Sequence, residues 1–103
     1  MAQYDVHANP GRNRQSYPYF VIVQSARFDA ARSRLVVPLS PVRGAVELSP
    51  VFRIEGREVA LVPLQMFAIP REALGALVAS LADDQSRIQI SNALDEVLTT
   101  AFG

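Results

Sequence analysis

The chain contains no cysteine and no tryptophan, and His7 is its single histidine. Without cysteine it has neither a disulfide framework nor a thiolate zinc site. One histidine is too few for a histidine-rich metal site, and the sequence has no metal-ligand or phosphate-loop spacing. We therefore expect neither a bound metal nor a cofactor.

An excess of charge of either sign is also missing. Ten basic residues balance ten acidic ones, so the formal net charge is zero at pH 7. This balance argues against nonspecific binding to nucleic acid or to an anionic membrane, because both depend on excess positive charge. No apolar run reaches the length of a membrane span, and the first residues lack the pattern of a signal peptide. We expect a cytoplasmic protein without a membrane segment.

Hydrophobic residues are plentiful, since they make up half of the 103 residues. A chain of this length and composition can fill one compact core, and it is typical of a single domain. The sequence therefore predicts one domain over residues 1–103.

Alternation of polar and apolar residues predicts short strands in the first two thirds of the chain. Five segments have this character: Gln3–His7, Tyr17–Ser25, Arg34–Leu39, Val51–Ile54 and Arg57–Leu64. Pro38 and Pro41 are expected to end the third of them. Glu55-Gly56 predicts a tight turn between the last two, because glycine adopts positive φ without strain.

The segment Tyr17–Ser25 is apolar on both faces. Tyr19, Val21 and Val23 point one way, whereas Phe20 and Ile22 point the other. Two interpretations stay open: a central strand covered on both sides by its own chain, or a strand covered by a partner subunit.

Three further segments allow less certain assignments. Asn9–Arg14 contains Asn-Pro-Gly, which is strong turn chemistry, and it is either a solvated hairpin loop or a contact loop. Val42–Ser49 is ambiguous, because it has some apolar content but Gly44 weakens any regular element. Met66–Ile69 has the character of a short strand.

Helical spacing begins after these strands. Pro70 suits a first helical position, and Leu74, Leu77, Val78 and Leu81 recur beyond it at helical intervals. These residues predict a helix that ends before Asp83-Asp84.

The clearest helix signal covers Ser86 to Ala101. Apolar side chains recur there at the intervals of one helix face: Ile90, Ala93, Leu94, Val97, Leu98 and Ala101. Polar residues fill the other side: Ser91, Asn92, Asp95, Glu96 and Thr99. Ser86 and Gln89 fit a capping box, and Asp83-Asp84 places negative charge at the helix N-terminus. The helix either docks on the core with a frayed tail or presents its end to a partner.

Strands followed by a helix predict a mainly β fold with a C-terminal α-helix, as an antiparallel sheet or small barrel. No residue set forms a convincing catalytic site, because a serine nucleophile would depend on His7 alone and no elbow motif surrounds any serine. From the residues alone, the chain is a β-rich domain that acts by binding.

Several stretches together resemble the CcdB family of bacterial toxins. Phe20-Val21-Ile22-Val23-Gln24-Ser25 is similar to the family's central strand, and Arg34-Leu35-Val36-Val37-Pro38-Leu39 to the strand that follows. Asp29, Val51–Ile54, Met66 and Ile69-Pro70 fall at matching intervals. Asn92-Ala93-Leu94 is similar to the start of the family's Asn-Ala-Ile run in the last helix.

The resemblance implies an SH3-like antiparallel barrel with a C-terminal helix, assembled as a homodimer. It implies the toxin of a type II toxin–antitoxin system, which binds the A subunit of DNA gyrase and traps that enzyme on cleaved DNA without catalysis of its own. It further implies a cognate antitoxin whose disordered segment folds on the toxin. No sequence-specific binding to nucleic acid is expected.

The family's last helix ends in Phe-Trp-Gly-Ile, where Trp-Gly-Ile is the gyrase-poisoning tip. In gapless register this chain has Leu98, Thr99, Thr100 and Ala101, whereas a shift of three places Phe102-Gly103 on Trp-Gly. Asp95 replaces an asparagine one turn earlier, and Arg27-Phe28 replaces two isoleucines. The resemblance thus implies these gyrase-binding residues: Arg27, Phe28, Asp95, Leu98, Thr99, Thr100, Ala101, Phe102 and Gly103.

Two alternatives remain at this point. A relative with the same fold class, the MazF/Kid type, is an endoribonuclease; here Arg32, Arg34 or Arg53 would stabilise the transition state with His7 or an aspartate as base. The other alternative is a degenerate toxin that acts only as an antitoxin-binding module.

Overall fold

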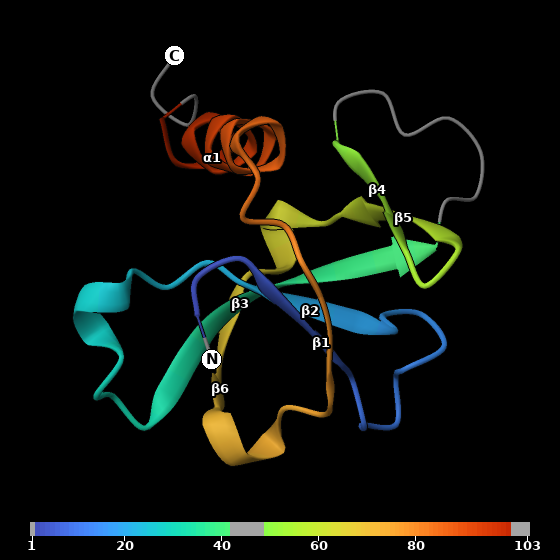
Figure 1. The fold of residues 1–103 in the computed structure, drawn as a ribbon, viewed down its shortest axis with the longest axis vertical. Coiled ribbons are helices and arrows are strands. Elements are labelled where there is room, and N and C mark those ends of the chain that lie inside the picture. Colours follow the sequence, from blue (N-terminus) through green and yellow to red (C-terminus); the bar gives the residue numbers. More distant parts are fainter. Residues whose placement is uncertain (1, 42–48, 100–103) are drawn as a thin grey trace.

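The computed structural model describes residues 2–41 and 49–99 (Figure 1). Its strands are β1 (Asp5–Ala8), β2 (Tyr19–Ile22), β3 (Ser33–Pro41), β4 (Val51–Ile54), β5 (Arg57–Leu61), β6 (Phe67–Pro70) and β7 (Leu77–Ser80). Single 3₁₀ turns are η1 (Ala26–Phe28), η2 (Pro63–Gln65) and η3 (Arg71–Ala73), and the α-helix is α1 (Asp84–Thr99). The predicted mainly β fold with a C-terminal helix is confirmed. In the described part of the chain no helix is long and apolar enough to cross a membrane.

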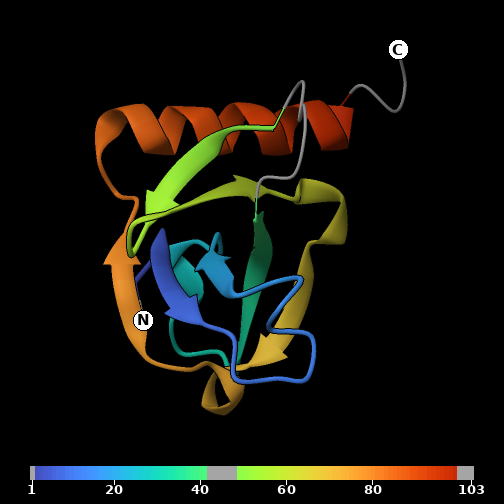
Figure 2. The same cartoon turned by 90° about the vertical axis from the view of Figure 1, so that its right-hand side faces the viewer.

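All strand pairs are antiparallel, in the order β4-β5-β3-β2-β1-β7, with β6 also paired to β3. The long strand β3 closes this arrangement. Its first residues pair with β6 and its last residues pair with β5, while β2 runs along its middle. Strand β3 therefore has β2 on one side and both β5 and β6 on the other, and the sheet curls into the half-barrel visible in Figures 1 and 2.

Strand β3 runs through Pro38, the first of the two prolines that were expected to end it, and its last residue is Pro41, the second. Pro38 lies opposite Phe20 in the ladder with β2, and its carbonyl accepts a hydrogen bond from the Val62 amide at 3.0 Å. Proline removes a donor but leaves its carbonyl, so the strand continues where only the acceptor is needed. The predicted end at Pro38 is therefore wrong.

Two apolar clusters cover the two faces of β2. Tyr19 and Val21 belong to the larger cluster, where α1 contributes Ile90 and Ala93. Phe20 and Ile22 belong to a smaller cluster with Val36. The chain itself therefore covers both faces of this strand, which is the first of the two interpretations that the sequence allowed, and its apolar faces are no argument for a partner subunit.

Strands β1 and β2 are both shorter than the predicted segments Gln3–His7 and Tyr17–Ser25, and both begin two residues later. Tyr4 has φ 70°, so the extended backbone of β1 begins only at Asp5. Strand β2 ends at Ile22, and Ser25 already caps η1. The predicted tight turn is confirmed, with φ of 51° at Glu55 and 76° at Gly56.

The helix predicted between Pro70 and Leu81 is wrong. This segment forms η3 and then β7, which pairs with β1. Gly75 donates from its amide to the Ala8 carbonyl at 2.9 Å, and the Ala8 amide donates to the Ala76 carbonyl at 2.8 Å. Pairing with a distant strand outweighs the local helical spacing, because short apolar segments fit both periods.

Replacing Gly75 by alanine is expected to destabilise this junction. A Cβ at position 75 would lie 2.5 Å from the Ala8 carbonyl oxygen, so the backbone of β1 or of the segment leading into β7 has to move. We expect Gly75→Ala to lower the free energy of unfolding by about 1–3 kcal/mol, as overpacking does. Urea denaturation measures it, and an unchanged midpoint would contradict the close approach.

Helix α1 begins two residues before Ser86. The Ser86 amide donates to Asp83 Oδ2 at 3.1 Å, and the Arg87 amide donates to the Asp83 carbonyl at 3.0 Å. The predicted capping box of Ser86 and Gln89 is therefore wrong, whereas the helix-start role of Asp83-Asp84 is confirmed. Hydrogen bonds from Ser86 hold the pKa of the Asp83 carboxyl below its usual value of 3.8.

This lowered pKa makes helix capping depend on pH. The charged carboxylate stabilises the fold above the unfolded-state pKa of 3.8, and this contribution is lost as pH falls through the lower folded-state pKa. Asp83→Asn keeps an acceptor oxygen but does not titrate. We expect the difference in melting temperature between the two proteins to be constant near neutral pH and to change below about pH 4. Thermal unfolding followed by circular dichroism measures it, and a difference independent of pH would contradict the cap.

Candidate protein-binding site

The apolar stripe of α1 is buried in the first half of the helix and emerges toward its end. Ile90 and Ala93 are buried, Leu94 and Val97 are half-buried, and Leu98 is 57% exposed. Figure 2 shows why: α1 lies across the curled sheet, and its last turn passes beyond the sheet and over η2. A large apolar side chain therefore faces solvent at the partner-binding position predicted from the resemblance.

The polar side of the helix is also as predicted. Ser91, Asn92, Asp95 and Glu96 are exposed. Thr99 is the last residue of α1. The predicted site residues Thr100, Ala101, Phe102 and Gly103 lie outside the described residues.

The other two predicted contact residues lie on η1, where the backbone is fixed by local hydrogen bonds. The Arg27 amide donates to Ser25 Oγ at 3.2 Å, and the Phe28 amide donates to the Ser25 carbonyl at 3.0 Å. Gln24 Nε2 donates to the Phe28 carbonyl at 2.9 Å. The backbone is thus held in place, while the Phe28 side chain is 62% exposed.

Within one chain the two parts of the predicted site are separate. Both views place η1 away from the C-terminal end of α1 (Figures 1 and 2). The structure therefore brings Asp95 and Leu98 together on one helix, and Arg27 and Phe28 together on one turn, but it does not join the two pairs.

One exposed residue beside α1 was missed from the sequence. Leu64 was assigned to a strand reaching from Arg57, but β5 ends at Leu61 and Pro63 begins η2. As a result Leu64 is 80% exposed on a turn that contacts α1. Pro63 was the available signal, because proline favours the first position of a helical turn.

The residues of the alternative nuclease site do not converge. Arg34 is buried, and its guanidinium donates to the carbonyls of Ala31 and Asp29 at 2.6 and 2.9 Å, so it supports a loop. Arg53 lies on β4, which three strands separate from β1 in the sheet, and its guanidinium is 4.0 Å from Glu58. Arg34 is therefore held by its own loop and is not presented to solvent.

His7 is also unavailable to solvent. It is 5% exposed, and its Nδ1 lies 2.9 Å from the Gly75 carbonyl, which can only accept, so Nδ1 carries the proton. The Asp5 carboxylate accepts a hydrogen bond from the Ala2 amide instead of from the imidazole. His7 joins the segment before β7 to β1. Among residues 2–41 and 49–99 no group of histidine and acidic side chains could hold a metal ion.

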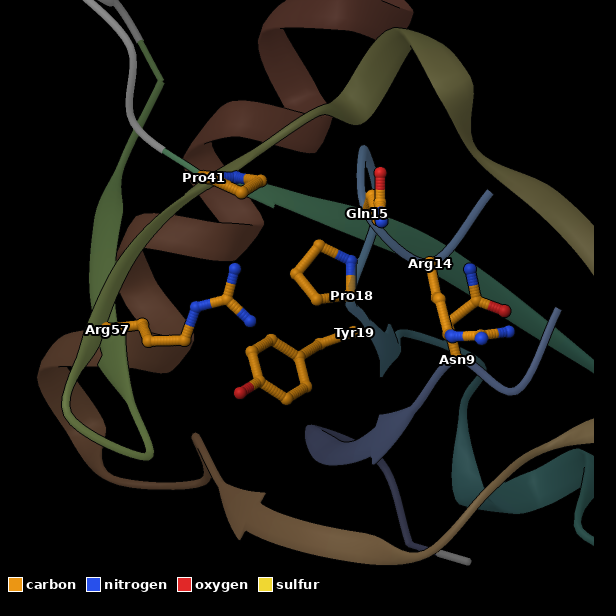
Figure 3. A pocket seen from close by; sticks show the side chains of 7 residues that line it. All are labelled: Asn9, Arg14, Gln15, Pro18, Tyr19, Pro41 and Arg57. Carbon is orange, nitrogen blue, oxygen red and sulfur yellow. The ribbon is translucent and has the colours of Figure 1, made fainter. Parts of the chain in front are cut away.

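A recess lies on another part of the surface, between the loop after β1 and the hairpin of β4 and β5. It has a volume of about 500 Å³, and its walls carry Arg14 from that loop and Arg57 from β5 (Figure 3). Tyr19 lies between them. The loop Asn9–Arg14, for which a contact loop was one of two interpretations, therefore lines a concave surface. No local sequence pattern could predict this surface.

Comparison with known families gives one match. The family model described as CcdB protein matches residues 3–100. A search of the curated proteins finds no match. The match spans every described strand and the described helix, from β1 to α1, so the chain belongs to the CcdB family.

Proposed function

We propose that this protein is the toxin of a type II toxin–antitoxin system and that it inhibits DNA gyrase by binding its A subunit. The observation that carries the proposal is the family match over residues 3–100, which supports a toxin of a toxin–antitoxin system. The mainly β half-barrel with its C-terminal helix is consistent with that family.

The proposed contact with gyrase is made by side chains that face solvent on fixed backbone. Leu98 and Asp95 lie on the exposed end of α1, and Arg27 and Phe28 lie on η1. Exposed large apolar side chains beside charged ones are typical of protein-binding surfaces. We include residues Thr99 to Gly103 in this contact by their place in the sequence. The protein acts by surface complementarity, with no reaction at its own side chains.

A homodimer is part of the proposal. Leu64 is 80% exposed on η2, and burying it against a second copy would remove this apolar surface from water while Leu98 stays available to gyrase. We expect light scattering to give twice the chain mass of 11.3 kDa at micromolar concentration. A mass of one chain would contradict the dimer.

The remaining parts of the proposal are the cellular location of the protein and its neutralisation by an antitoxin. Residues 1–103 form one domain in the cytoplasm, and a cognate antitoxin neutralises it with a segment that orders on binding. Production of the protein without antitoxin is expected to arrest growth, and a gyrase A subunit refractory to this family is expected to restore it. Harmless production would refute the activity while leaving the fold unaffected.

One observation favours a second candidate. In gapless register Leu98, Thr99, Thr100 and Ala101 occupy the positions of the family's Phe-Trp-Gly-Ile tip. A toxin without this tip would still bind antitoxin as a competing module. Antitoxin pull-down combined with the growth assay separates the two functions, because the module binds antitoxin without arresting growth.

A further inference from the structure

The side chain of Gln24 joins two segments of the chain at the point where β2 ends. Its Nε2 donates to the Phe28 carbonyl of η1 at 2.9 Å, and its Oε1 accepts from the Leu35 amide of β3 at 2.8 Å. The donor and the acceptor of one side-chain amide are thus used on different segments. Gln24 thereby connects the turn that carries Phe28 to the sheet.

The acceptor of Gln24 replaces a main-chain acceptor of the sheet. Strand β2 ends at Ile22, and the next amide, that of Val23, still donates to the Leu35 carbonyl at 3.0 Å. In an antiparallel pair the return bond would run from the Leu35 amide to the Val23 carbonyl. That carbonyl accepts from Gln3 Nε2 at 3.1 Å instead, and the Leu35 amide donates to Gln24. The chain therefore leaves the sheet after Val23 while the Leu35 amide keeps a partner.

The residues that follow η1 are held from the other side by Arg34. This side chain is 4% exposed. Its Nη1 donates to the carbonyls of Ala31 and Ser33 at 2.6 and 3.0 Å, and its Nη2 donates to the Asp29 carbonyl at 2.9 Å. The segment between β2 and β3 is therefore fixed twice, by Gln24 where it leaves β2 and by Arg34 where it enters β3.

The Phe28 carbonyl is the point where these bonds meet. It accepts from Gln24 Nε2 at 2.9 Å and from the Ala31 amide at 3.0 Å, so both of its lone pairs are used. The Phe28 side chain, in contrast, is 62% exposed, and Arg27 beside it is exposed as well. The main chain at this turn is thus fixed, while its two side chains are free to contact another protein.

We propose that Gln24 is a positioning residue for the gyrase contact, which holds Arg27 and Phe28 in their binding arrangement without touching gyrase. Both ends of its amide group are occupied by the main chain of its own protein. A turn that is ordered before association loses less conformational entropy on binding, so its restraint contributes to affinity. The inference rests on the proposed function, because gyrase is the partner that this turn would contact.

Two variants separate the two hydrogen bonds of Gln24, and amide hydrogen exchange followed by NMR reads each bond. Gln24→Met has a side chain of similar length that makes neither bond, whereas Gln24→Glu keeps the acceptor for Leu35 but has no donor for Phe28. We expect exchange at the Leu35 and Ala31 amides to be up to about tenfold faster in Gln24→Met. In Gln24→Glu only the Ala31 amide should exchange faster. The Val37 amide, within β3, is the internal control and should be unchanged in both.

The affinity for the purified gyrase A subunit, measured by surface plasmon resonance, tests the consequence for binding. Gln24→Met and Gln24→Glu should each weaken binding by about tenfold, because the turn then has to be ordered on association. Gly75→Ala is the control, since it destabilises the fold at the junction of β1 and the segment before β7. Well below its melting temperature it should change the affinity by less than about twofold, because a loss of stability acts only through the unfolded fraction.

Three results would overturn the inference. They are unchanged exchange at the Leu35 and Ala31 amides in Gln24→Met, full affinity of the Gln24 variants for gyrase, and equal weakening by Gly75→Ala. Melting temperatures check that each variant is folded. Full affinity of the Gln24 variants, with gyrase binding by the unaltered protein intact, would refute the inference alone. Absence of gyrase binding by the unaltered protein would refute the proposed function together with the role of Gln24 in it, so the two failures are distinguishable.

Discussion

Leu98→Asp is expected to abolish growth arrest while leaving the protein folded. Leu98 is 57% exposed near the end of α1, so an aspartate there costs the fold little. In the proposed complex this side chain is buried against gyrase, where an unpaired charge is strongly unfavourable. We expect at least a hundredfold loss of affinity, or about 3 kcal/mol. Viable counts after induction without antitoxin measure the effect.

Ile88→Asp is the matched control. Ile88 lies on the same helix with the same chemistry and 59% exposure, but in its N-terminal half, outside the proposed contact. The Ile88→Asp protein should arrest growth like the unaltered protein. The melting temperatures of both variants should lie within a few degrees of that of the unaltered protein. Full toxicity of the Leu98→Asp protein would show that the exposed end of α1 is not part of the gyrase contact.

Ile90→Ala is expected to cause the largest loss of stability. Ile90 is 0% exposed and belongs to the larger apolar cluster, together with Val21 of β2 and Val59 of β5. Truncation removes its transfer free energy and leaves a cavity between helix and sheet, at a cost of roughly 2–5 kcal/mol. For a domain of this size that lowers the melting temperature by roughly 10 °C or more. Urea and thermal denaturation both measure it.

Ile88→Ala provides the comparison for this substitution as well. Ile88 faces solvent on the same helix, so its truncation should change the free energy of unfolding by less than about 0.5 kcal/mol. Equal effects of Ile90→Ala and Ile88→Ala would contradict the packing of α1 on the sheet.

The parts of the fold that sequence analysis predicted are those with strong local patterns. The apolar faces of β2 and the stripe that places Ile90 in the core both follow from side-chain period. Glu55-Gly56 predicted its turn because few residue pairs suit positive φ. In each case the information lies within a few neighbouring residues.

The errors arise where distant residues decide the structure. The spacing of Leu74, Leu77 and Val78 predicts a helix, but pairing with β1 through Gly75 and Ala8 makes the segment extended. The burial of Arg34 was not predicted, because its carbonyl partners come from the folded loop before it. The convergence of Arg14, Tyr19 and Arg57 likewise depends on topology alone.

Supercoiling of plasmid DNA by purified gyrase, with the purified protein added, tests the central claim most directly. If the protein acts by binding the A subunit, supercoiling should fall as its concentration rises, and linear DNA should appear once the trapped gyrase is denatured. Leu98→Asp should leave gyrase unaffected in the same reaction. Unimpaired supercoiling and no linear DNA at a large molar excess of the folded protein would contradict the account.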